Sequence, residues 1–247
     1  MSLIDVKHLS FAYEKNKKVL DDLSASFEKG RIIALIGKNG SGKTSFLDCL
    51  LGINEYQGEI TFDGKDIKGM SNKEFSRLVS FIPQSVNTNI DYNIRDFISF
   101  GRNPHLNLLS SLTAKDYEIV DKNAERCGIA SLLGKNINSV SGGERQLVYI
   151  ARALSQETPI IIMDEPTASL DFGNQQKLFR IMQSLAKEGK TIVFTTHNPN
   201  HLVNLECDIF AVKNGQLSKI GELNKSTIKE IYDNDFDMEG KAFIFRL

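Results

Sequence analysis

The stretch that decides the fold of this chain is IIALIGKNGSGKT, which runs from Ile32 to Thr44. Its first part, Ile32–Ile36, is entirely apolar, and a short run of this kind is typical of a β-strand buried on both faces. The second part, Gly37–Thr44, fits the pattern GxxxxGK[ST], and an apolar helix is expected over residues 45–51. The stretch therefore predicts a strand, a glycine-rich loop and a helix in direct succession.

A loop of this kind is suited to binding phosphates. Its glycines allow backbone N–H groups to point into one concavity, and the N-terminus of the following helix adds positive potential. Lys43 is expected to reach the outer phosphates and Thr44 to hold Mg²⁺. A plain glycine-rich turn is the alternative, but it does not explain Lys43 and Thr44 at this offset. The predicted nucleotide-binding residues of the loop are Gly37, Asn39, Gly40, Ser41, Gly42, Lys43, Thr44 and Ser45.

Other apolar runs predict an α/β fold with a largely parallel sheet. Residues 159–163 and 191–195 are expected to be buried strands, and the apolar stripe over residues 178–185 predicts a helix between them. The pattern of the tail predicts a helix at 227–232 and ends in an apolar run at 242–245. Periodicity alone does not place residues 233–247 in the fold.

An inserted helical part is expected within this core. Helices are predicted at 94–100, 115–127 and 142–155, and no strand is expected among them. We therefore expect a helical subdomain at residues 85–156 between core segments 1–84 and 157–247. Together these segments would form a single domain.

Two acids end one of the buried strands. Asp164 and Glu165 directly follow Ile160–Met163, at a point where a sheet tolerates charge only if the strand emerges at a site or in solvent. Asp164 would organise the Mg²⁺ shell, and Glu165 could polarise an attacking water. The alternative is a solvated strand end before the turn at Pro166. Next to a phosphate loop, that alternative is the weaker interpretation.

The segment Ser141–Glu144 opens a predicted helix with two glycines. Locally, Ser-x-x-Glu is a capping box, and most such sequences mean no more than that. The glycines are the unusual feature, because each costs about 1 kcal/mol relative to alanine inside a helix. Close approach of an anion to the backbone N–H groups of this first turn would explain them.

Composition excludes several classes of protein. The 247 residues are 41% hydrophobic and 25% charged, which is typical of globular domains, and no apolar run approaches the roughly 20 residues of a membrane-spanning helix. No secretory leader is recognised at the start, so a cytosolic location is expected. The net charge of -1 gives no reason to expect nucleic-acid binding. Three widely separated cysteines indicate packed, reduced thiols rather than disulfides or a zinc site.

Five segments together resemble the ATP-binding cassette (ABC) ATPases. In chain order they are the Walker A loop Gly37–Thr44, the signature Ser141–Gln146, the Walker B strand Ile160–Glu165, the D-loop Ser169–Asp171 and the H-loop residue His197. Five motifs in this order are highly specific, and flanking features extend the resemblance to nearly the whole chain. The resemblance implies an α/β fold with a P-loop NTPase core and mostly parallel sheet, an N-terminal antiparallel β subdomain and an inserted helical subdomain.

The resemblance also implies a composite site. In this family two cassettes pair head to tail, so that the signature of one closes over the nucleotide of the other. Ser141 and Gly143 would then contact the γ-phosphate of the partner's ATP. The signature and D-loop residues expected at the nucleotide are Ser141, Gly142, Gly143, Glu144 and Asp171. One departure is Val140, where the signature usually begins with leucine, and this exchange is conservative.

Further single residues take roles from the same resemblance. Tyr13 matches the aromatic residue that stacks on adenine, although an exposed tyrosine at a strand end is the plain alternative. Gln84 matches the Q-loop glutamine that senses Mg²⁺ and the attacking water, and His197 matches the switch histidine at the γ-phosphate. The implied catalytic residues are Glu165, His197, Gln84 and Lys43, and the implied Mg²⁺ residues are Thr44, Gln84 and Asp164.

A finer resemblance involves the segment Phe100–His105. Its Gly101-Arg102-Asn103-Pro104-His105 looks like the GRxPH segment of importers for iron-siderophore, haem and cobalamin. A simple helix stop, with glycine followed closely by proline, is the alternative. His105 is not expected to be a metal ligand, because no second ligand lies at suitable spacing.

These resemblances lead us to expect the ATPase subunit of an importer. Two copies would bind two MgATP and drive separate transmembrane permease subunits, with a substrate-binding protein outside the cell acting indirectly. The chain would sit on the inner face of the cell membrane, docked through residues 85–156. The alternatives are a soluble ABC ATPase acting on DNA or the ribosome, which usually carries a coiled-coil insertion or a second cassette, and an exporter subunit. The sequence does not identify the transported cargo, because the cargo never touches this chain.

Overall fold

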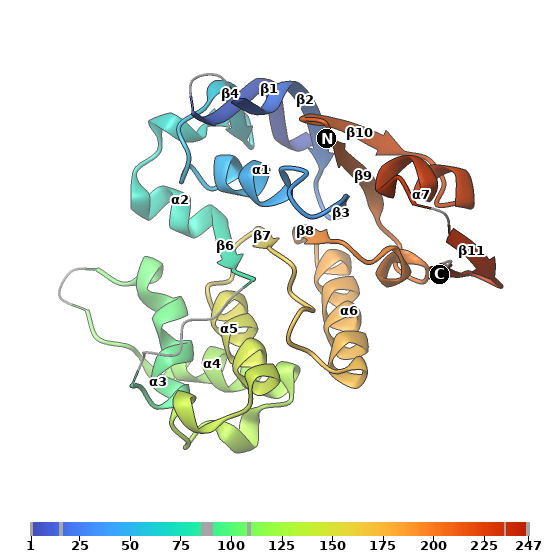
Figure 1. Cartoon of the computed structure of the whole chain (residues 1–247). Helices are drawn as coiled ribbons and strands as arrows, with labels where there is room; N and C mark the ends of the chain where they lie inside the picture. The colour runs from blue at the N-terminus through green and yellow to red at the C-terminus, as the bar shows by residue number, and fades with distance from the viewer. Residues whose placement is uncertain (1, 15–16, 85–90, 108–109, 235, 246–247) are drawn as a thin grey trace. The chain divides into compact units, whose positions relative to one another are not determined.

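A computed structural model of the chain describes residues 2–14, 17–84, 91–107, 110–234 and 236–245 (Figure 1). The chain divides into two compact units, one formed by residues 1–70 with 186–247 and the other by residues 71–185. The predicted helical subdomain, residues 85–156, lies within the second unit, and its bounds remain a prediction. Among the described residues, no helix combines the length and the apolar character needed to cross a bilayer.

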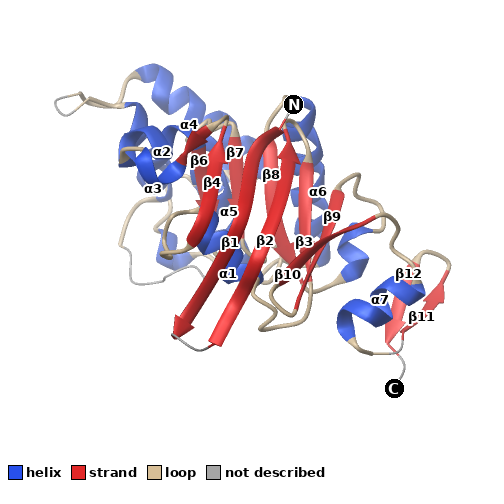
Figure 2. Ribbon diagram, turned by 90° about the horizontal axis from the view of Figure 1, so that it is seen from above, coloured by secondary structure: helices blue, strands red, loops and turns tan. Residues whose placement is uncertain are grey.

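An antiparallel sheet begins the first unit, as the resemblance implied (Figure 2). Its strands are β1 (Ser2–Glu14), β2 (Lys17–Glu28), β4 (Gln57–Phe62) and β5 (Lys65–Asp66), in the order β2-β1-β4-β5. Ile4 of β1 pairs with Phe27 on one side and Phe62 on the other, and all three are buried. The register shifts near His8, which has a φ of 52°. A Cβ atom at Gly58 would lie 2.4 Å from the carbonyl oxygen of His8, so this irregularity requires glycine there.

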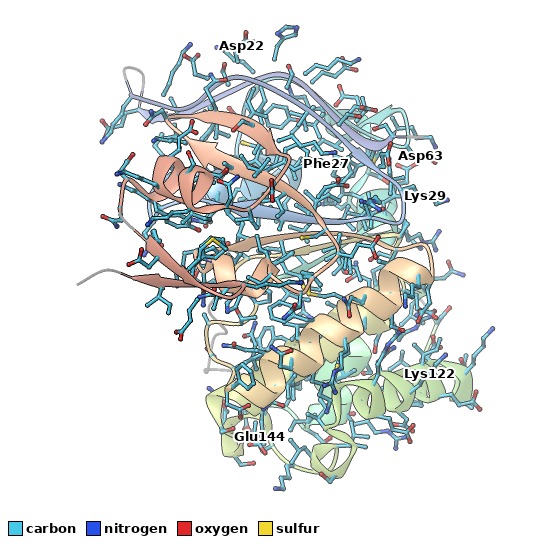
Figure 3. The ribbon with its side chains drawn as sticks, turned by 90° about the vertical axis from the view of Figure 1, so that its right-hand side faces the viewer. Asp22, Phe27, Lys29, Asp63, Lys122 and Glu144 are labelled. Carbon is cyan, nitrogen blue, oxygen red and sulfur yellow. The ribbon has the colours of Figure 1, made fainter. Side chains whose placement is uncertain are left out.

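A second sheet of the first unit carries the strands predicted at 32–36 and 191–195. It contains β3 (Ile32–Ile36), β8 (Thr191–Thr196), β9 (Asp208–Lys213) and β10 (Gln216–Ile220). Strand β3 pairs in parallel with β8 and β9, whereas β10 pairs antiparallel with β9. The helix α1 (Lys43–Leu50) follows β3. Phe27, labelled in Figure 3, links the two sheets and the helix, because its ring packs edge-on against Phe46 of α1 and Phe210 of β9.

The second unit is largely helical, with one pair of strands. Strands β6 (Val79–Ile82) and β7 (Ile160–Met163) are parallel, and no strand lies between them in the described part of the chain. The helices are α2 (Asn72–Leu78), α3 (Ile94–Ser99), α4 (Ala114–Cys127), α5 (Gly142–Ser155) and α6 (Phe172–Lys187), with short 3₁₀ turns η2 (Phe100–His105), η3 (Ala130–Leu132) and η4 (Ile137–Ser139). Capping boxes begin α2, α4 and α5 at Ser71, Thr113 and Ser141.

Several predicted bounds shift by a residue or two for local reasons. The helix predicted from residue 45 begins at Lys43, because Gly42 forms its N-cap. The helix predicted at 94–100 ends at Ser99 and continues as η2. The helix predicted at 227–232 begins at Lys225, because the Asn224 side chain caps it by accepting from the N–H of Thr227. The prediction for 142–155 agrees with α5.

The described part of the tail that periodicity could not place forms a hairpin after the predicted helix. Helix α7 (Lys225–Tyr232) precedes β11 (Phe236–Glu239) and β12 (Ala242–Phe245), which pair antiparallel with each other. The remaining short elements of the first unit are the 3₁₀ turns η1 (Ile67–Gly69) and η5 (Pro199–Leu202).

The cysteines are free thiols, two buried and one half-buried. Burial raises the pKa of Cys49, Cys127 and Cys207 to about 12, so all three are protonated at neutral pH.

Candidate nucleotide-binding site

The predicted site residues form two groups, one on each unit. The first unit carries Tyr13, His197 and the loop Gly37–Ser45. The second unit carries Gln84, the acids Asp164 and Glu165, the signature Ser141–Glu144 and Asp171.

The phosphate loop has the backbone that its glycines predicted. Gly40 and Gly42 have φ values of 77° and 101°, a region that glycine enters without steric cost. Gly37 is required for another reason, because a Cβ atom there would lie 2.5 Å from the carbonyl oxygen of Val212. A Cβ atom at Gly40 would meet nothing within 4 Å, so the chain leaves space above the loop at this position.

Lys43 lies folded over this loop. Its side chain is buried, and Nζ donates hydrogen bonds to the carbonyl oxygens of Gly37 and Lys38, at 2.8 and 2.9 Å. The N-terminus of α1 has neither a side-chain cap nor an acidic residue in its first turn. Backbone N–H groups and an ammonium therefore meet at one place, and this donor set fits the phosphates of a nucleotide.

Tyr13 lies beside the first turn of α1. Its hydroxyl is 3.1 Å from Oγ of Ser45, and its ring stands edge-on to Phe11 with centroids 4.7 Å apart. The residue is nevertheless 67% exposed. An aromatic ring fixed at one edge and open to solvent can accept a base by stacking.

His197 follows the strand next to the one that carries the phosphate loop. Ile36, the last residue of β3, pairs with Thr196, the last residue of β8. Gly37 and His197 therefore leave the sheet side by side, because the carboxyl ends of neighbouring parallel strands meet at one edge. His197 is exposed there. The structure thus brings the predicted switch histidine to the phosphate loop.

In the second unit, the paired strands β6 and β7 bring Gln84 to the two acids. Ile82 pairs with Met163, and the N–H of Asp164 donates to the Ile82 carbonyl oxygen at 2.9 Å. Nε2 of Gln84 donates a 3.1 Å hydrogen bond to Oε2 of Glu165. Asp164 is buried, whereas Glu165 is half-buried. Oxygen donors of this kind suit Mg²⁺, and the carboxylate of Glu165 is placed to accept a proton.

Glu165 also has an unusual backbone. Its φ of 41° lies in the left-handed region that non-glycine residues rarely enter. Strain of this kind costs of order 1–3 kcal/mol and is concentrated at functional sites. We therefore regard the position of this carboxylate as functionally constrained.

The signature segment forms its capping box. Oγ of Ser141 accepts from the N–H of Glu144, and the N–H of Ser141 donates to Oε2 of Glu144. The N–H of Ser141 and its hydroxyl both donate to Oε2 of Glu144, and these two hydrogen bonds lower the pKa of the Glu144 carboxyl. A Cβ atom at Gly142 would meet nothing, so no neighbour within the described chain requires glycine there. At Gly143 a Cβ atom would lie 3.1 Å from the carbonyl oxygen of Ser169 in the D-loop, which is one intrachain reason for glycine.

The D-loop is held by residues that the sequence did not single out. Oδ1 of Asp171 accepts from the N–H of Asn174 at 2.8 Å. Nε2 of Gln175 donates to the Leu170 carbonyl oxygen at 3.0 Å. For the contact between Gln175 and Leu170, the only sequence signal is a polar residue at position 175, near the start of a helix.

A second unforeseen contact involves the C-terminal part of the first unit. Asp233 accepts from Lys38 of the phosphate loop and from Lys213 of β9, each at 2.8 Å. These two lysines lower the pKa of the Asp233 carboxyl to about 2, with Lys213 the larger influence. The carboxylate is therefore charged throughout the neutral range and ties the end of α7 to the loop.

The Gly101–His105 segment packs within the second unit. A Cβ atom at Gly101 would lie 2.3 Å from the Arg152 carbonyl oxygen. The buried Arg102 donates to Asp116 at 2.9 Å, to the Ser155 carbonyl oxygen at 2.7 Å and to Glu157 at 2.8 Å. The ring of His105 lies 2.8 Å from the carbonyl oxygen of Gln156. This segment therefore has a packing role that explains its residue types without reference to any cargo.

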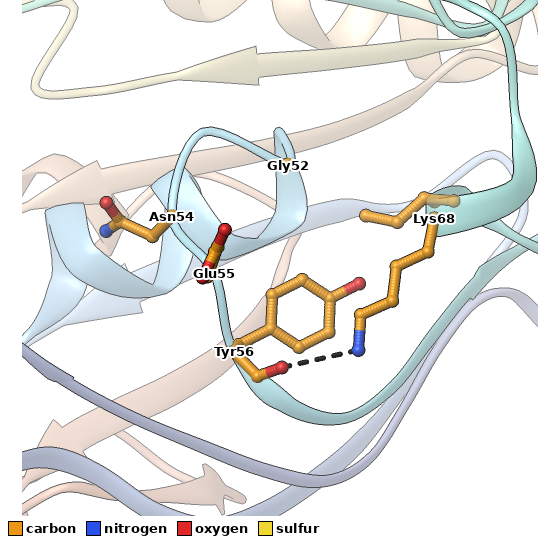
Figure 4. Close-up of a pocket in the computed structure, with 6 residues that line it drawn as sticks. Gly52, Asn54, Glu55, Tyr56 and Lys68 are labelled. Carbon is orange, nitrogen blue, oxygen red and sulfur yellow. Dashed lines mark hydrogen bonds between the residues drawn. The ribbon is translucent and has the colours of Figure 1, made fainter.

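Another pocket lies away from every predicted site residue (Figure 4). It has a volume of about 460 Å³ and is bordered by Asn54, Tyr56 and Lys68. Nζ of Lys68 lies 4.2 Å from the centre of the Tyr56 ring and donates to its carbonyl oxygen. The Tyr56 hydroxyl is buried, which raises its pKa, and the exposed Glu55 also lines this pocket.

Comparison with known proteins identifies what the chain resembles as a whole. A model of the ABC transporter family matches residues 20–168. A relative from Helicobacter pylori, "Probable iron chelatin transport ATP-binding protein", is 36% identical over 218 residues, which cover 87% of this chain and 85% of the relative. "Molybdate import ATP-binding protein MolC" from Haemophilus influenzae is 33% identical over 221 residues, which cover 89% and 82%.

A solved structure is similar over nearly the whole length. It is a chain of a metal-chelate type ABC transporter in an inward-facing conformation, with a TM-score of 0.82 and 28% identity. The match covers 99% of the present chain and 96% of that chain.

Proposed function

The chain belongs to the ABC transporter family and is an ATPase, and from this premise we propose that it powers an importer of metal chelates of the iron-siderophore, haem or cobalamin class. The geometry of the phosphate loop supports ATP as the substrate most directly, because Lys43 and the uncapped N-terminus of α1 meet there. The net charge of -1 gives no support to the alternative of a nucleic-acid partner.

The two groups of site residues would perform different parts of ATP hydrolysis. Lys43 and the loop N–H groups would stabilise negative charge on the phosphates during in-line transfer to water. Glu165, aligned by Gln84, would orient the water and accept its proton, and His197 would contact the γ-phosphate. Thr44, Asp164 and Gln84 would hold Mg²⁺, which would supply positive charge to offset that of the phosphates.

A second copy of the chain would complete the site. Ser141 and Gly143 of one copy would contact the ATP on the other, with Asp171 at the interface between them. The open space at Gly142 supports this assignment, because no neighbour within the described chain requires a glycine at that position. Two copies would therefore enclose two ATP molecules.

The second unit offers a surface for the permease. A pocket of about 410 Å³ is lined by Phe100, Arg152 and Gln156, with Ser76, Gly101, Asn103 and Pro104. The exposed ring of Phe100 packs against the exposed ring of Tyr92, with the ring centroids 5.0 Å apart. Exposed aromatic side chains next to a guanidinium are typical of protein interfaces. We place the cytoplasmic loop of a permease here, which would hold the chain on the inner face of the membrane.

The cargo class rests on the similar proteins rather than on the site. One relative is named for an iron chelatin and the similar structure for a metal chelate, whereas another relative is named for molybdate. Since the Gly101–His105 segment has its own packing role, it adds little to this choice. Purifying the chain with its permease from detergent extract, and testing whether a ferric siderophore or molybdate stimulates its ATPase, distinguishes the two cargoes.

The ATPase assignment is tested by removing the loop ammonium. Lys43→Ala is expected to abolish MgATP hydrolysis by the purified chain, because the outer phosphates lose their principal cation. The matched control is Lys29→Ala, since Lys29, labelled in Figure 3, is exposed in the first unit and is not a predicted site residue. Hydrolysis by Lys43→Ala at the wild-type rate would contradict the proposal.

A further inference from the structure

The turn that carries His197 is tied together internally. Nδ1 of His201 lies 2.8 Å from Oγ1 of Thr196, which is buried at the end of β8. The same Oγ1 accepts from the N–H of Asn198 at 3.1 Å. Residues 196–201 therefore form a short turn closed by hydrogen bonds, and His197 lies within it.

Asn200 joins this turn to the C-terminal hairpin. Its Nδ2 donates to the carbonyl oxygen of Phe243 at 3.0 Å, and its Oδ1 accepts from the Phe243 N–H at 2.8 Å. The side chain thus makes the pair of hydrogen bonds that a neighbouring β-strand would make. The Phe243 side chain is buried, so packing holds in place the strand to which Asn200 is hydrogen-bonded.

The hairpin is anchored at its other end to the phosphate loop. The buried ring of Phe236 packs against Tyr232 of α7, with ring centroids 5.9 Å apart. At the end of α7, Asp233 binds both Lys38 and Lys213. A continuous series of contacts therefore leads from the phosphate loop through α7 and the hairpin to the His197 turn.

From these contacts we infer that Asn200 is a positioning residue for His197, and that the hairpin Phe236–Phe245 is the support on which it acts. The inference rests on the proposed ATPase function, since it assigns His197 to the γ-phosphate. Asn200 itself does not touch the nucleotide. It fixes the turn, so that the imidazole remains aligned with the phosphate loop on the neighbouring strand.

A role in positioning predicts a loss of turnover rather than of ATP affinity. Asn200→Ala is expected to lower kcat roughly tenfold, because a 1 Å displacement of a catalytic group can cost ~10²-fold in rate. The KM for MgATP should change by less than about twofold, since the phosphate loop and Tyr13 are untouched. The matched control is Lys225→Ala, which removes the exposed ion pair to Asp237 of the same hairpin but leaves the Asn200 contacts.

A double mutant separates positioning from simple stability. If Asn200 acts through His197, Asn200→Ala should lower kcat no further in a His197→Ala background, because effects within one unit are not additive. Additive losses, or a wild-type kcat in the single Asn200→Ala variant, would overturn the inference.

A readout without turnover keeps the inference separate from the proposed function. The imidazole NMR signal of His197, assigned by its absence in His197→Ala, should shift or broaden in Asn200→Ala and remain in place in Lys225→Ala. An unmoved signal in Asn200→Ala overturns the inference even where no ATPase is measured. If the wild-type chain showed no ATPase activity, that result would instead contradict the proposed function alone.

Discussion

Replacing Arg102 with methionine should destabilise the second unit strongly. Arg102 is 6% exposed and donates to Asp116, to Glu157 and to the carbonyl oxygen of Ser155 at the end of α5. The substitution keeps much of the side-chain volume but leaves the Asp116 carboxylate without its buried cation. Breaking a buried pair in this way costs about 3–5 kcal/mol.

The lower end of that range applies here. Asp116 retains two hydrogen bonds from Thr113, one from the N–H at 2.9 Å and one from Oγ1 at 2.7 Å. Glu157 is half exposed, so water replaces that contact at little cost. We therefore expect a loss of about 3 kcal/mol, which for a chain of this size lowers Tm by about 6–12 °C.

Thermal unfolding followed by circular dichroism measures this loss. The control is Arg95→Met, because the Arg95–Asp121 pair is 45% and 39% exposed and should contribute at most about 1 kcal/mol. Arg102→Lys should fall between the two, since it keeps the charge but not the three separate contacts. A Tm for Arg102→Met equal to that of Arg95→Met would refute the assignment of this segment to packing.

Three further outcomes are expected. Tyr13→Ala should weaken ATP binding by about 1–3 kcal/mol in calorimetry while Tyr13→Phe should not, and equal losses would point to the hydroxyl instead of the ring. Hydrogen bonds from Thr113 lower the pKa of Asp116 to about 2 from its usual 3.8, so its stabilisation is complete above pH 3.8 and disappears as pH falls through 2. Acid unfolding of Asp116→Asn should accordingly depend less on pH over that window than wild-type unfolding does. Cysteines placed at Ser41 and Gly142 should form an ATP-dependent bond between two chains, and a bond within one chain only would contradict the head-to-tail site; the background must lack Cys49, Cys127 and Cys207.

Features of the fold that are encoded locally could be predicted from the sequence. The strand Ile32–Ile36 and the phosphate loop after it each depend on residues within a few positions of one another. The helix Gly142–Ser155 was predicted for the same reason, because its cap and its apolar stripe are both local. Their periodicity and turn chemistry are therefore visible in a short window.

Contacts between distant residues were not predictable in this way. Asn200 and Phe243 lie 43 positions apart, and Lys38 and Asp233 lie 195 apart. The sequence does not distinguish a buried arginine such as Arg102 from an exposed one. Its packing role becomes visible only when the fold brings Asp116 and Ser155 beside it. Hydrogen bonds of this kind have no period, and tertiary structure alone defines them.

The roles of the individual site residues follow from the family resemblance and remain predictions. The structure adds the contact between Gln84 and Glu165 and the strained backbone of Glu165, both of which agree with a carboxylate held for catalysis. It also places His197 directly after β8, the strand that pairs with β3 ahead of the phosphate loop.

The rate of MgATP hydrolysis by Glu165→Gln tests the central claim most directly. The amide has nearly the shape of the carboxylate and can still pair with Gln84, but it accepts no proton from water. Hydrolysis should slow by roughly 10²–10⁴-fold, the usual effect of losing a general base. ATP binding should persist, and the protein should accumulate as an ATP-bound dimer in gel filtration. Turnover at the wild-type rate in this variant would contradict the claim that this chain hydrolyses ATP through Glu165.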